Sequence, residues 1–86
     1  MITGKETMTN KEIYDDAFCR ILETEQDKLE GLEFKGVPAW DSIGHMQLLT
    51  ELEELFDIDI DSDDVFEFSS YEKGMEMLSE KYHVEF

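Results

Sequence analysis

The chain has 86 residues, 41% of them hydrophobic and 12% aromatic, and its 23 acidic residues against 7 basic ones give a formal net charge of −16. This apolar and aromatic content favours one small folded domain over a disordered acidic tail. The negative charge argues against binding to nucleic acid or to an anionic membrane surface, and it favours a basic protein partner. The sequence contains no apolar segment long enough for membrane insertion, and its single cysteine, Cys19, cannot form an internal disulfide. We therefore expect a monomeric, cytoplasmic protein.

The first helix is predicted from about Asn10 to Glu25, after a loose leader at residues 1–8, and residues 9–86 are expected to form a single domain. Thr9 and Glu12 have the spacing of a capping box. The apolar stripe of this helix consists of Ile13, Ala17, Phe18, Ile21 and Leu22, with Tyr14 on its flank. Cys19 lies just outside the centre of the stripe, so we expect a half-buried, unreactive thiol.

A long connection without helical periodicity follows, from Gln26 to Trp40. Gly31, Gly36 and Pro38 interrupt it. Its isolated apolar residues are Leu29, Leu32, Phe34, Val37 and Trp40. A loop of this length in a small domain either packs down or has a function, and these residues predict that it packs against the core.

The second helix is predicted from Ser42 to about Phe56. Its apolar stripe consists of Ile43, Met46, Leu49, Leu52, Leu55 and Phe56, widened by Leu48. The following DIDIDSDD is interpreted as an extended loop that places Ile58 and Ile60 in the core, before a short helical turn from Ser62 to Glu67. A last helix begins after Ser69 or Ser70, with Tyr71, Met75, Leu78 and Tyr82 on one face. The sequence thus predicts an all-α fold, a small bundle of three main helices and one short helix, with a long loop between helices one and two.

Two kinds of active or metal site are disfavoured by the pattern of residues. Ser42 and His45 lie three residues apart, but a nucleophile also needs an oriented base and donors for an oxyanion, which one helix start does not supply. A calcium-binding loop that starts at Asp57 would place Ser62 at the position of the required glycine and Phe68 at that of the bidentate glutamate. We expect neither an enzyme nor a specific metal site, although weak binding of divalent cations to the acidic run stays open.

Asp41 and Ser42, directly before the second apolar stripe, suggest an N-cap. If Asp41 accepts the backbone N–H of Ile43 or Gly44, Ser42 is the first helical residue and its hydroxyl is free to point outward. A phosphate ester on that hydroxyl would lie beside the free N–H groups of the helix, which favour an anion by about 0.3–1 kcal/mol at an exposed position.

These residues resemble the acyl carrier proteins of the phosphopantetheine-binding superfamily. The stretch DSIGHMQLLTELEELFDIDI is similar to the family's Asp-Ser-Leu or Asp-Ser-Ile motif, acidic second helix and following loop, and SSYEKGMEML is similar to its final helix. The resemblance covers about residues 9 to 82. It implies an acyl-carrier-like fold, a 4′-phosphopantetheine arm attached covalently to Ser42 with Asp41 as the adjacent cap, and an acyl group held on the arm as a thioester. Trp40 in place of a leucine, and Gly44 with His45 after the motif, suggest a carrier dedicated to one biosynthetic pathway, in fatty acid, polyketide or related biosynthesis.

The acidic second helix has an expected role within this resemblance. No basic residue lies between Lys35 and Lys73, so a uniformly negative surface adjoins Ser42. We expect it to present the arm to a phosphopantetheinyl transferase, which uses magnesium and coenzyme A, and to acyl-loading and acyl-transferring enzymes with basic docking surfaces. The candidate partner-binding residues are Met46, Thr50, Glu51, Glu53, Glu54 and Asp57. For Met46, core packing is an equal alternative. The competing hypothesis for the whole chain is an unmodified acidic helical adaptor that docks a basic protein.

Overall fold

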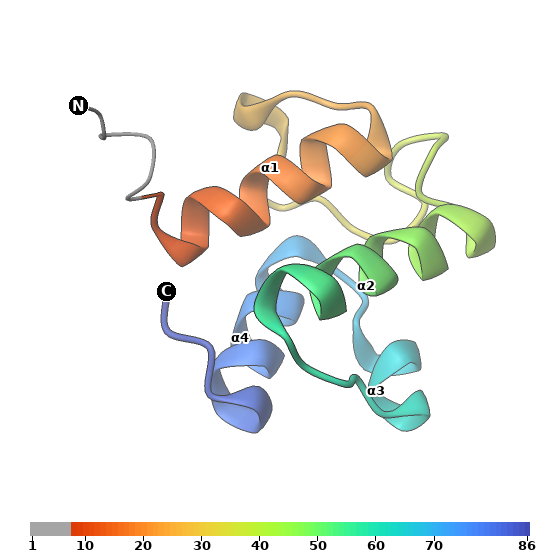
Figure 1. Cartoon of the computed structure of the whole chain (residues 1–86). Coiled ribbons are helices and arrows are strands. Elements are labelled where there is room, and N and C mark those ends of the chain that lie inside the picture. The colour runs from red at the N-terminus through yellow and green to blue at the C-terminus, as the bar shows by residue number, and fades with distance from the viewer. Residues whose placement is uncertain (1–7) are drawn as a thin grey trace.

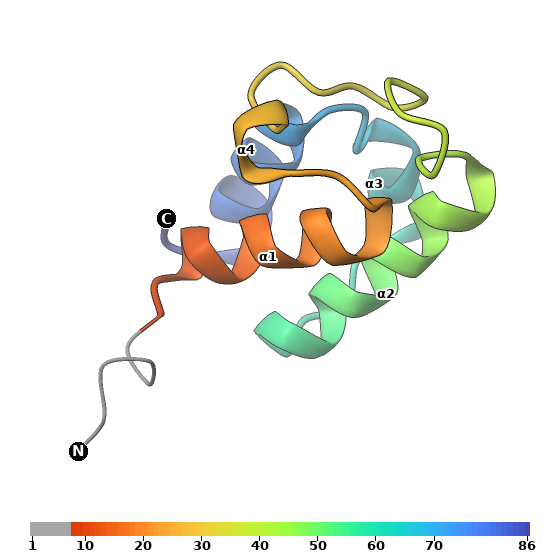
Figure 2. The ribbon, with the colours of Figure 1, turned by 90° about the horizontal axis from the view of Figure 1, so that it is seen from above.

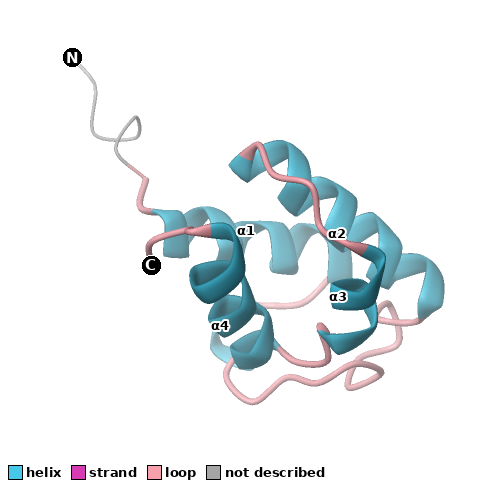
Figure 3. Ribbon diagram, turned by 90° about the horizontal axis from the view of Figure 1, so that it is seen from below, coloured by secondary structure: helices cyan, strands magenta, loops and turns pink. Residues whose placement is uncertain are grey.

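The structure, a computed structural model, describes residues 8–86. Its elements are α1 (Asn10–Leu22), the short 3-10 helix η2 (Gln26–Lys28), α2 (Ser42–Phe56), α3 (Ser62–Glu67) and α4 (Tyr71–Tyr82) (Figure 1). This part of the chain forms no strand, only an isolated β-bridge (Figure 3). The predicted fold, three main helices and one short helix, is confirmed. Except for Met8, the predicted leader lies outside the described residues, and within them no helix has the length and hydropathy to cross a membrane.

Helix α1 begins at the predicted capping box and ends earlier than predicted. The Thr9 hydroxyl accepts the backbone N–H of Glu12 (3.1 Å), and the Glu12 carboxylate accepts the backbone N–H of Thr9 (2.9 Å). The helix stops at Leu22 rather than at Glu25, because Glu23 adopts the left-handed conformation (φ 55°). The backbone N–H groups of Glu23 and Thr24 both point back to the carbonyl of Cys19, which closes the helix.

Aromatic side chains from three parts of the chain meet in the core. Phe18 of α1 lies edge-to-face with Trp40 (5.5 Å between ring centroids, 88°) and with Tyr71 of α4 (5.4 Å, 90°). Tyr14, predicted on the flank of the α1 stripe, is instead fully buried. Burial is possible because its hydroxyl donates to the backbone carbonyl of Tyr71 (2.7 Å).

The long loop between α1 and α2 crosses one end of the bundle and packs on it, as predicted (Figure 2). Leu29, Leu32 and Trp40 are buried, and Phe34 and Val37 are half-buried. A bridge joins the middle of the loop to the start of α4: the N–H of Phe34 donates to the carbonyl of Ser69 (2.9 Å), and the N–H of Tyr71 to that of Leu32 (2.8 Å). The loop is therefore an ordered part of the domain that packs against its core.

The buried face of α2 differs from the predicted one. The residues in the core are Leu48, Leu49 and Leu52, with Phe56 half-buried, whereas Ile43, Met46 and Leu55 have 70%, 51% and 41% of their surface exposed. The apolar residues of this helix cover more of its circumference than the bundle can bury. Three residues of the predicted stripe therefore lie at the surface, and Ile43 and Met46 flank the start of the helix.

Helix α3 is tied to α4 through a buried carboxylate. Asp64 accepts hydrogen bonds from the ammonium group of Lys81 (2.7 Å) and the hydroxyl of Tyr82 (2.5 Å). The same hydroxyl accepts the backbone N–H of Asp61 (2.9 Å). Before α3, Ile60 is buried and Ile58 half-buried, as predicted for the extended DIDIDSDD segment.

The hydrogen bonds of Asp64 to Lys81 and Tyr82 should make the free energy of unfolding depend on pH. The hydrogen bond from Lys81, with that from Tyr82, lowers the pKa of Asp64 below its ordinary value. A carboxyl group whose pKa is lowered by folding stabilises the fold above the unfolded pKa of about 4 and loses that contribution as the pH falls through its folded pKa. In urea melts, Asp64→Asn should have a lower free energy of unfolding than the wild type at neutral pH. This difference in stability should become smaller below about pH 4. A gap that does not change with pH would contradict this role for Asp64.

Candidate functional site

The start of α2 presents an exposed serine next to its cap. Asp41 is the N-cap residue, and its carboxylate accepts the backbone N–H of Gly44 (2.9 Å). Ser42 is the first residue of the helix and is exposed. Within residues 8–86 its hydroxyl makes no hydrogen bond to another side chain or to the backbone. Because Asp41 does the capping, the Ser42 hydroxyl is left free for chemistry.

The preceding loop fixes the position of this helix start. The N–H of Trp40 donates to the carbonyl of Val37 (3.0 Å), and the carbonyl of Trp40 accepts the N–H of Lys35 (2.9 Å). Gly44 is buried against the loop so closely that a Cβ atom there would lie 1.9 Å from the carbonyl oxygen of Ala39. The glycine is therefore required by close packing of the first turn of α2.

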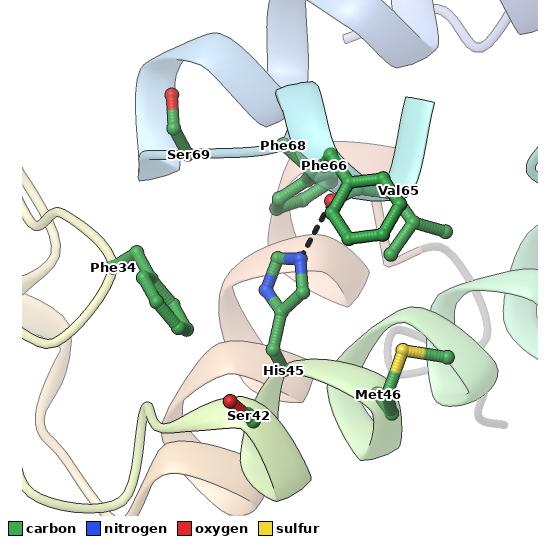
Figure 4. Close-up of a pocket in the computed structure, with 8 residues that line it drawn as sticks. All are labelled: Phe34, Ser42, His45, Met46, Val65, Phe66, Phe68 and Ser69. Atoms are coloured by element: carbon green, nitrogen blue, oxygen red, sulfur yellow. Dashed lines mark hydrogen bonds between the residues drawn. The ribbon is translucent and has the colours of Figure 1, made fainter. Parts of the chain in front are cut away.

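A cavity of about 470 Å³ opens beside Ser42 (Figure 4). It lies between the start of α2, the loop and α3, and its lining residues are Phe34, Ser42, His45, Met46, Val65, Phe66, Phe68 and Ser69. Most of the wall is aromatic or aliphatic, and no acidic or basic side chain other than His45 lines it. The sequence did not predict this cavity, because its walls come from segments far apart in the chain.

His45, the one polar ring in the cavity wall, is fully engaged. Its Nδ1 atom lies 2.9 Å from the indole Nε1 of Trp40, and its Nε2 atom lies 2.7 Å from the backbone carbonyl oxygen of Val65. Neither nitrogen is available to take a proton from Ser42, which agrees with the sequence-based argument against a Ser42–His45 nucleophile. The only sign of these bonds in the amino-acid sequence is a tryptophan followed five residues later by a histidine.

The structure separates the candidate partner-binding residues into two groups. Met46, Thr50 and Glu54 are exposed and lie at four-residue steps, so they form one line along α2. The others have structural partners: Glu51 pairs with Arg20 of α1 (2.9 Å), and Glu53 accepts the backbone N–H of Ile60 (2.8 Å). Asp57 is the C-cap of α2, in the left-handed conformation (φ 56°).

Neither Cys19 nor the acidic run lines the cavity beside Ser42. Cys19 is half-buried, as predicted, and burial raises the pKa of its thiol above the ordinary value, which lowers its reactivity. Among residues 8–86, no group of three or more His, Cys, Asp or Glu side chains is arranged to hold a metal ion.

Removing the cap should destabilise the start of α2. We expect Asp41→Ala to lower the free energy of unfolding by about 0.5–2 kcal/mol, the usual cost of losing an N-cap. Asp41→Asn is the matched control, since asparagine caps helices about as well as aspartate and should retain most of this stability. Urea melts of the two variants and the wild type measure the difference. Equal stability of Asp41→Ala and Asp41→Asn would show that the hydrogen bond to Gly44 contributes nothing.

Comparison with known protein families gives one match. The model of the phosphopantetheine attachment site matches residues 40–73, from Trp40 through α2 and α3 to the first turn of α4. No curated protein and no solved structure matched the chain. Domains of this family are carriers without catalytic activity of their own, and their prosthetic group is 4′-phosphopantetheine on a serine. The exposed helix start lies within the matched residues and its apolar cavity within or beside them, and the chain thus contains a segment, residues 40–73, that matches the phosphopantetheine attachment site domain of carrier proteins.

Proposed function

We propose that this chain is an acyl carrier protein whose residues 9–86 act as one cytoplasmic domain in a dedicated biosynthetic pathway. The 4′-phosphopantetheine arm is attached to Ser42 and holds an acyl group as a thioester. The observation that carries the proposal is the free, exposed Ser42 hydroxyl at the first position of α2, within the matched residues. Beside it, the free N–H groups of the helix start favour the phosphate of the arm.

The other serines among residues 40–73 are poorer acceptors. The Ser70 hydroxyl caps α4 by accepting the backbone N–H of Lys73 (3.0 Å). Ser62 is, like Ser42, an exposed first residue of a helix after an aspartate N-cap, but α3 has only six residues. A phosphate on Ser62 would meet Asp61 and Asp63 on both sides, whereas Ser42 has an acidic neighbour only at Asp41. Ser69 is exposed, but it precedes the cap of α4 and is not at the start of a helix. These contrasts support Ser42 as the attachment residue.

The surroundings of Ser42 include an apolar cavity directly beside the attachment point. When attached, the arm supplies the terminal thiol on which an acyl group is carried. This chain's own residues contribute the exposed hydroxyl, the cap that keeps it free and the apolar cavity of about 470 Å³ beside it. No acidic side chain lines the cavity to repel the phosphate.

A phosphopantetheinyl transferase, with magnesium and coenzyme A, is the first partner of this surface, followed by enzymes that load and transfer the acyl group. Met46, Thr50 and Glu54 form the exposed line that such partners would contact, and the excess of negative charge favours basic docking surfaces. Glu51, Glu53 and Asp57 contribute charge to the same region, but each also has a structural partner or role in α2.

Reversing one exposed charge on this line should weaken encounter with the transferase. Because Glu53 holds the backbone of Ile60, the cleaner variant is Glu54→Lys, which we expect to raise the apparent KM about two- to fivefold at low salt with little change in kcat. The difference should shrink as salt rises, since exposed charges are screened over about 10 Å at 0.1 M ionic strength.

Glu30→Lys is the matched control for this charge reversal. Glu30 is also exposed, but it lies in the loop next to Gly31, whose N–H donates to Glu72 of α4. The Glu30→Lys variant changes the net charge by the same amount as Glu54→Lys and should leave KM near the wild-type value. If both variants raise KM equally, the effect is one of overall charge and α2 is not the docking surface.

The proposed function is tested by intact mass after incubation with coenzyme A, magnesium and a transferase of broad specificity. We expect a mass gain of one phosphopantetheine group. Cleavage after glutamate should place it on the peptide from Phe34 to Glu51, in which Ser42 is the sole serine. An unmodified chain that nevertheless binds a basic protein through α2 would instead support the alternative, an acidic adaptor without a prosthetic group.

A further inference from the structure

The hydrogen bonds of His45 define the protonation state of its ring. An indole N–H can only donate, so the Nδ1 atom facing Trp40 at 2.9 Å must be the unprotonated acceptor. The ring is then neutral, with its proton on Nε2, and that N–H donates to the carbonyl oxygen of Val65 at 2.7 Å (Figure 4). Trp40 is fully buried, so this tautomer is selected by a partner that cannot turn away into solvent.

The hydrogen bond from His45 to the carbonyl of Val65 supplies a donor that the short helix α3 lacks. Carbonyl groups in the last turn of a helix have no backbone donor of their own, and in the six-residue helix α3 they make up most of the helix. The described turn and cap bonds give the carbonyls of Asp61 and Asp64 a backbone donor, whereas Val65 receives the histidine. His45 thus connects the first turn of α2 to α3 across the cavity.

Helix α3 is consequently held from two sides. On the side of α4, Asp64 is bonded to Lys81 and Tyr82. On the side of α2, His45 is the polar link to α3 itself, and Glu53 holds the N–H of Ile60 two residues before α3 begins. Around His45 the contact consists of side chains that surround a cavity. Val65, Phe66 and Phe68 of this segment form the cavity wall opposite Ser42 and Met46, as Figure 4 shows. If the bond between His45 and Val65 breaks while Asp64 stays bonded to Lys81 and Tyr82, this wall is the part of the cavity that can move away from α2.

We propose that His45 is a positioning residue that latches α3 over the attachment end of α2, so that the cavity beside Ser42 widens when the bond between His45 Nε2 and Val65 breaks. The latch acts on the wall of the cavity and does not touch the Ser42 hydroxyl. It gives the proposed carrier function a gate beside the arm, and this consequence rests on the proposed function. The latch itself is a property of the unmodified chain.

Two substitutions separate the two hydrogen bonds of the ring. In His45→Gln the side-chain amide nitrogen can take the place of Nε2 and donate to Val65, while the acceptor for Trp40 is lost. In His45→Asn the side-chain oxygen can take the place of Nδ1 and accept from Trp40, while the donor to Val65 is lost. Each variant loses one hydrogen bond of similar worth, so their global stabilities in urea should be similar. They differ in whether α3 stays latched.

Amide hydrogen exchange of the unmodified chain is the test. In His45→Asn, the amides of residues 65–68 should exchange about five- to tenfold faster than in the wild type, beyond any change shared with α1 and α4. In His45→Gln, the exchange of these amides should follow the rest of the chain. Equal exchange of residues 65–68 in the two variants would overturn the latch.

A second measurement needs no variant. In ¹⁵N NMR spectra of the wild-type ring at mildly alkaline pH, Nε2 should be protonated and Nδ1 bare, with a slowly exchanging Nε2 proton. A ring that is protonated on Nδ1, or that averages between the two tautomers, would overturn the proposal even if His45→Asn failed to fold. Both experiments are repeated in Ser42→Ala, where the latch should persist. A failure of the attachment assignment and a failure of the latch are thus distinguishable.

Discussion

Ser42→Ala should fold like the wild type and take up no phosphopantetheine at all. Ser42 is exposed, its hydroxyl makes no hydrogen bond within residues 8–86, and Asp41 already caps α2, so the substitution should change the free energy of unfolding by less than about 0.5 kcal/mol. The loss of modification should be complete, because no other hydroxyl can replace the ester oxygen. Circular dichroism and urea melts measure whether the fold is kept, and intact mass measures whether the modification is lost.

Ser69→Ala is the matched control for this loss. Ser69 lines the same cavity and is also exposed, but it lies on the opposite wall, before α4 (Figure 4). It should keep full modification. A mass gain that survives in Ser42→Ala and disappears in Ser69→Ala would move the attachment residue across the cavity.

Gly44→Ala should be the most damaging single-methyl change near the site. An alanine in a helix is normally favoured over glycine by about 1 kcal/mol. At residue 44, however, the added carbon would lie 1.9 Å from the carbonyl oxygen of Ala39, a backbone atom that cannot move without shifting the loop before Asp41. We expect a loss of about 1–3 kcal/mol, the usual range for overpacking, and at least tenfold slower modification of Ser42.

The exposed Gln47 provides the comparison for helix propensity. It lies one turn further along α2, and Gln47→Ala and Gln47→Gly should differ by the ordinary preference for alanine. At residue 44 the order of stability should be reversed, with glycine more stable than alanine. If Gly44→Ala were as stable as the wild type and modified at the same rate, the loop would be free to retreat and the close packing would not position Ser42.

Local signals in the sequence were sufficient for the start of the functional helix. Asp41 before an apolar run predicts an N-cap, and the structure places its carboxylate on the N–H of Gly44. The ends of helices were less accessible. Glu23, Asp57 and His83 all adopt the left-handed conformation without being glycine, so the residue type that usually marks such an end is missing. This explains why α1 was predicted to continue to Glu25.

Which part of α2 is buried depends on contacts that the periodicity does not contain. Apolar residues occupy much of this helix, and the pattern included Ile43 and Met46 in the core. In the structure Trp40 and half-buried His45 occupy the space near the start of the helix, so Ile43 and Met46 are left at the surface. Met46, with 51% of its surface exposed, is not a core residue, and its contact with partners stays a prediction.

The cavity and the His45 bonds could not be predicted because they join distant segments. Phe34 comes from the loop, Phe66 from α3 and Ser69 from the turn before α4, and no local spacing relates them to Ser42. Glu53 illustrates the same point. Its position suggested an exposed docking charge, but the chain returns after α2 and places the N–H of Ile60 on its carboxylate. Long-range contacts assign these residues their roles.

The burial of Trp40 gives the molecule an optical probe of its own. The chain has one tryptophan, and that residue is fully buried, next to the attachment motif, with its indole N–H on His45. Ultraviolet emission excited at the indole therefore originates from a single place, within two residues of Ser42. Changes at the arm, at the loop or at α3 would alter the intensity or wavelength of that emission without any added dye. Attachment of the proposed arm to Ser42 should thus be observable in real time in the unlabelled protein.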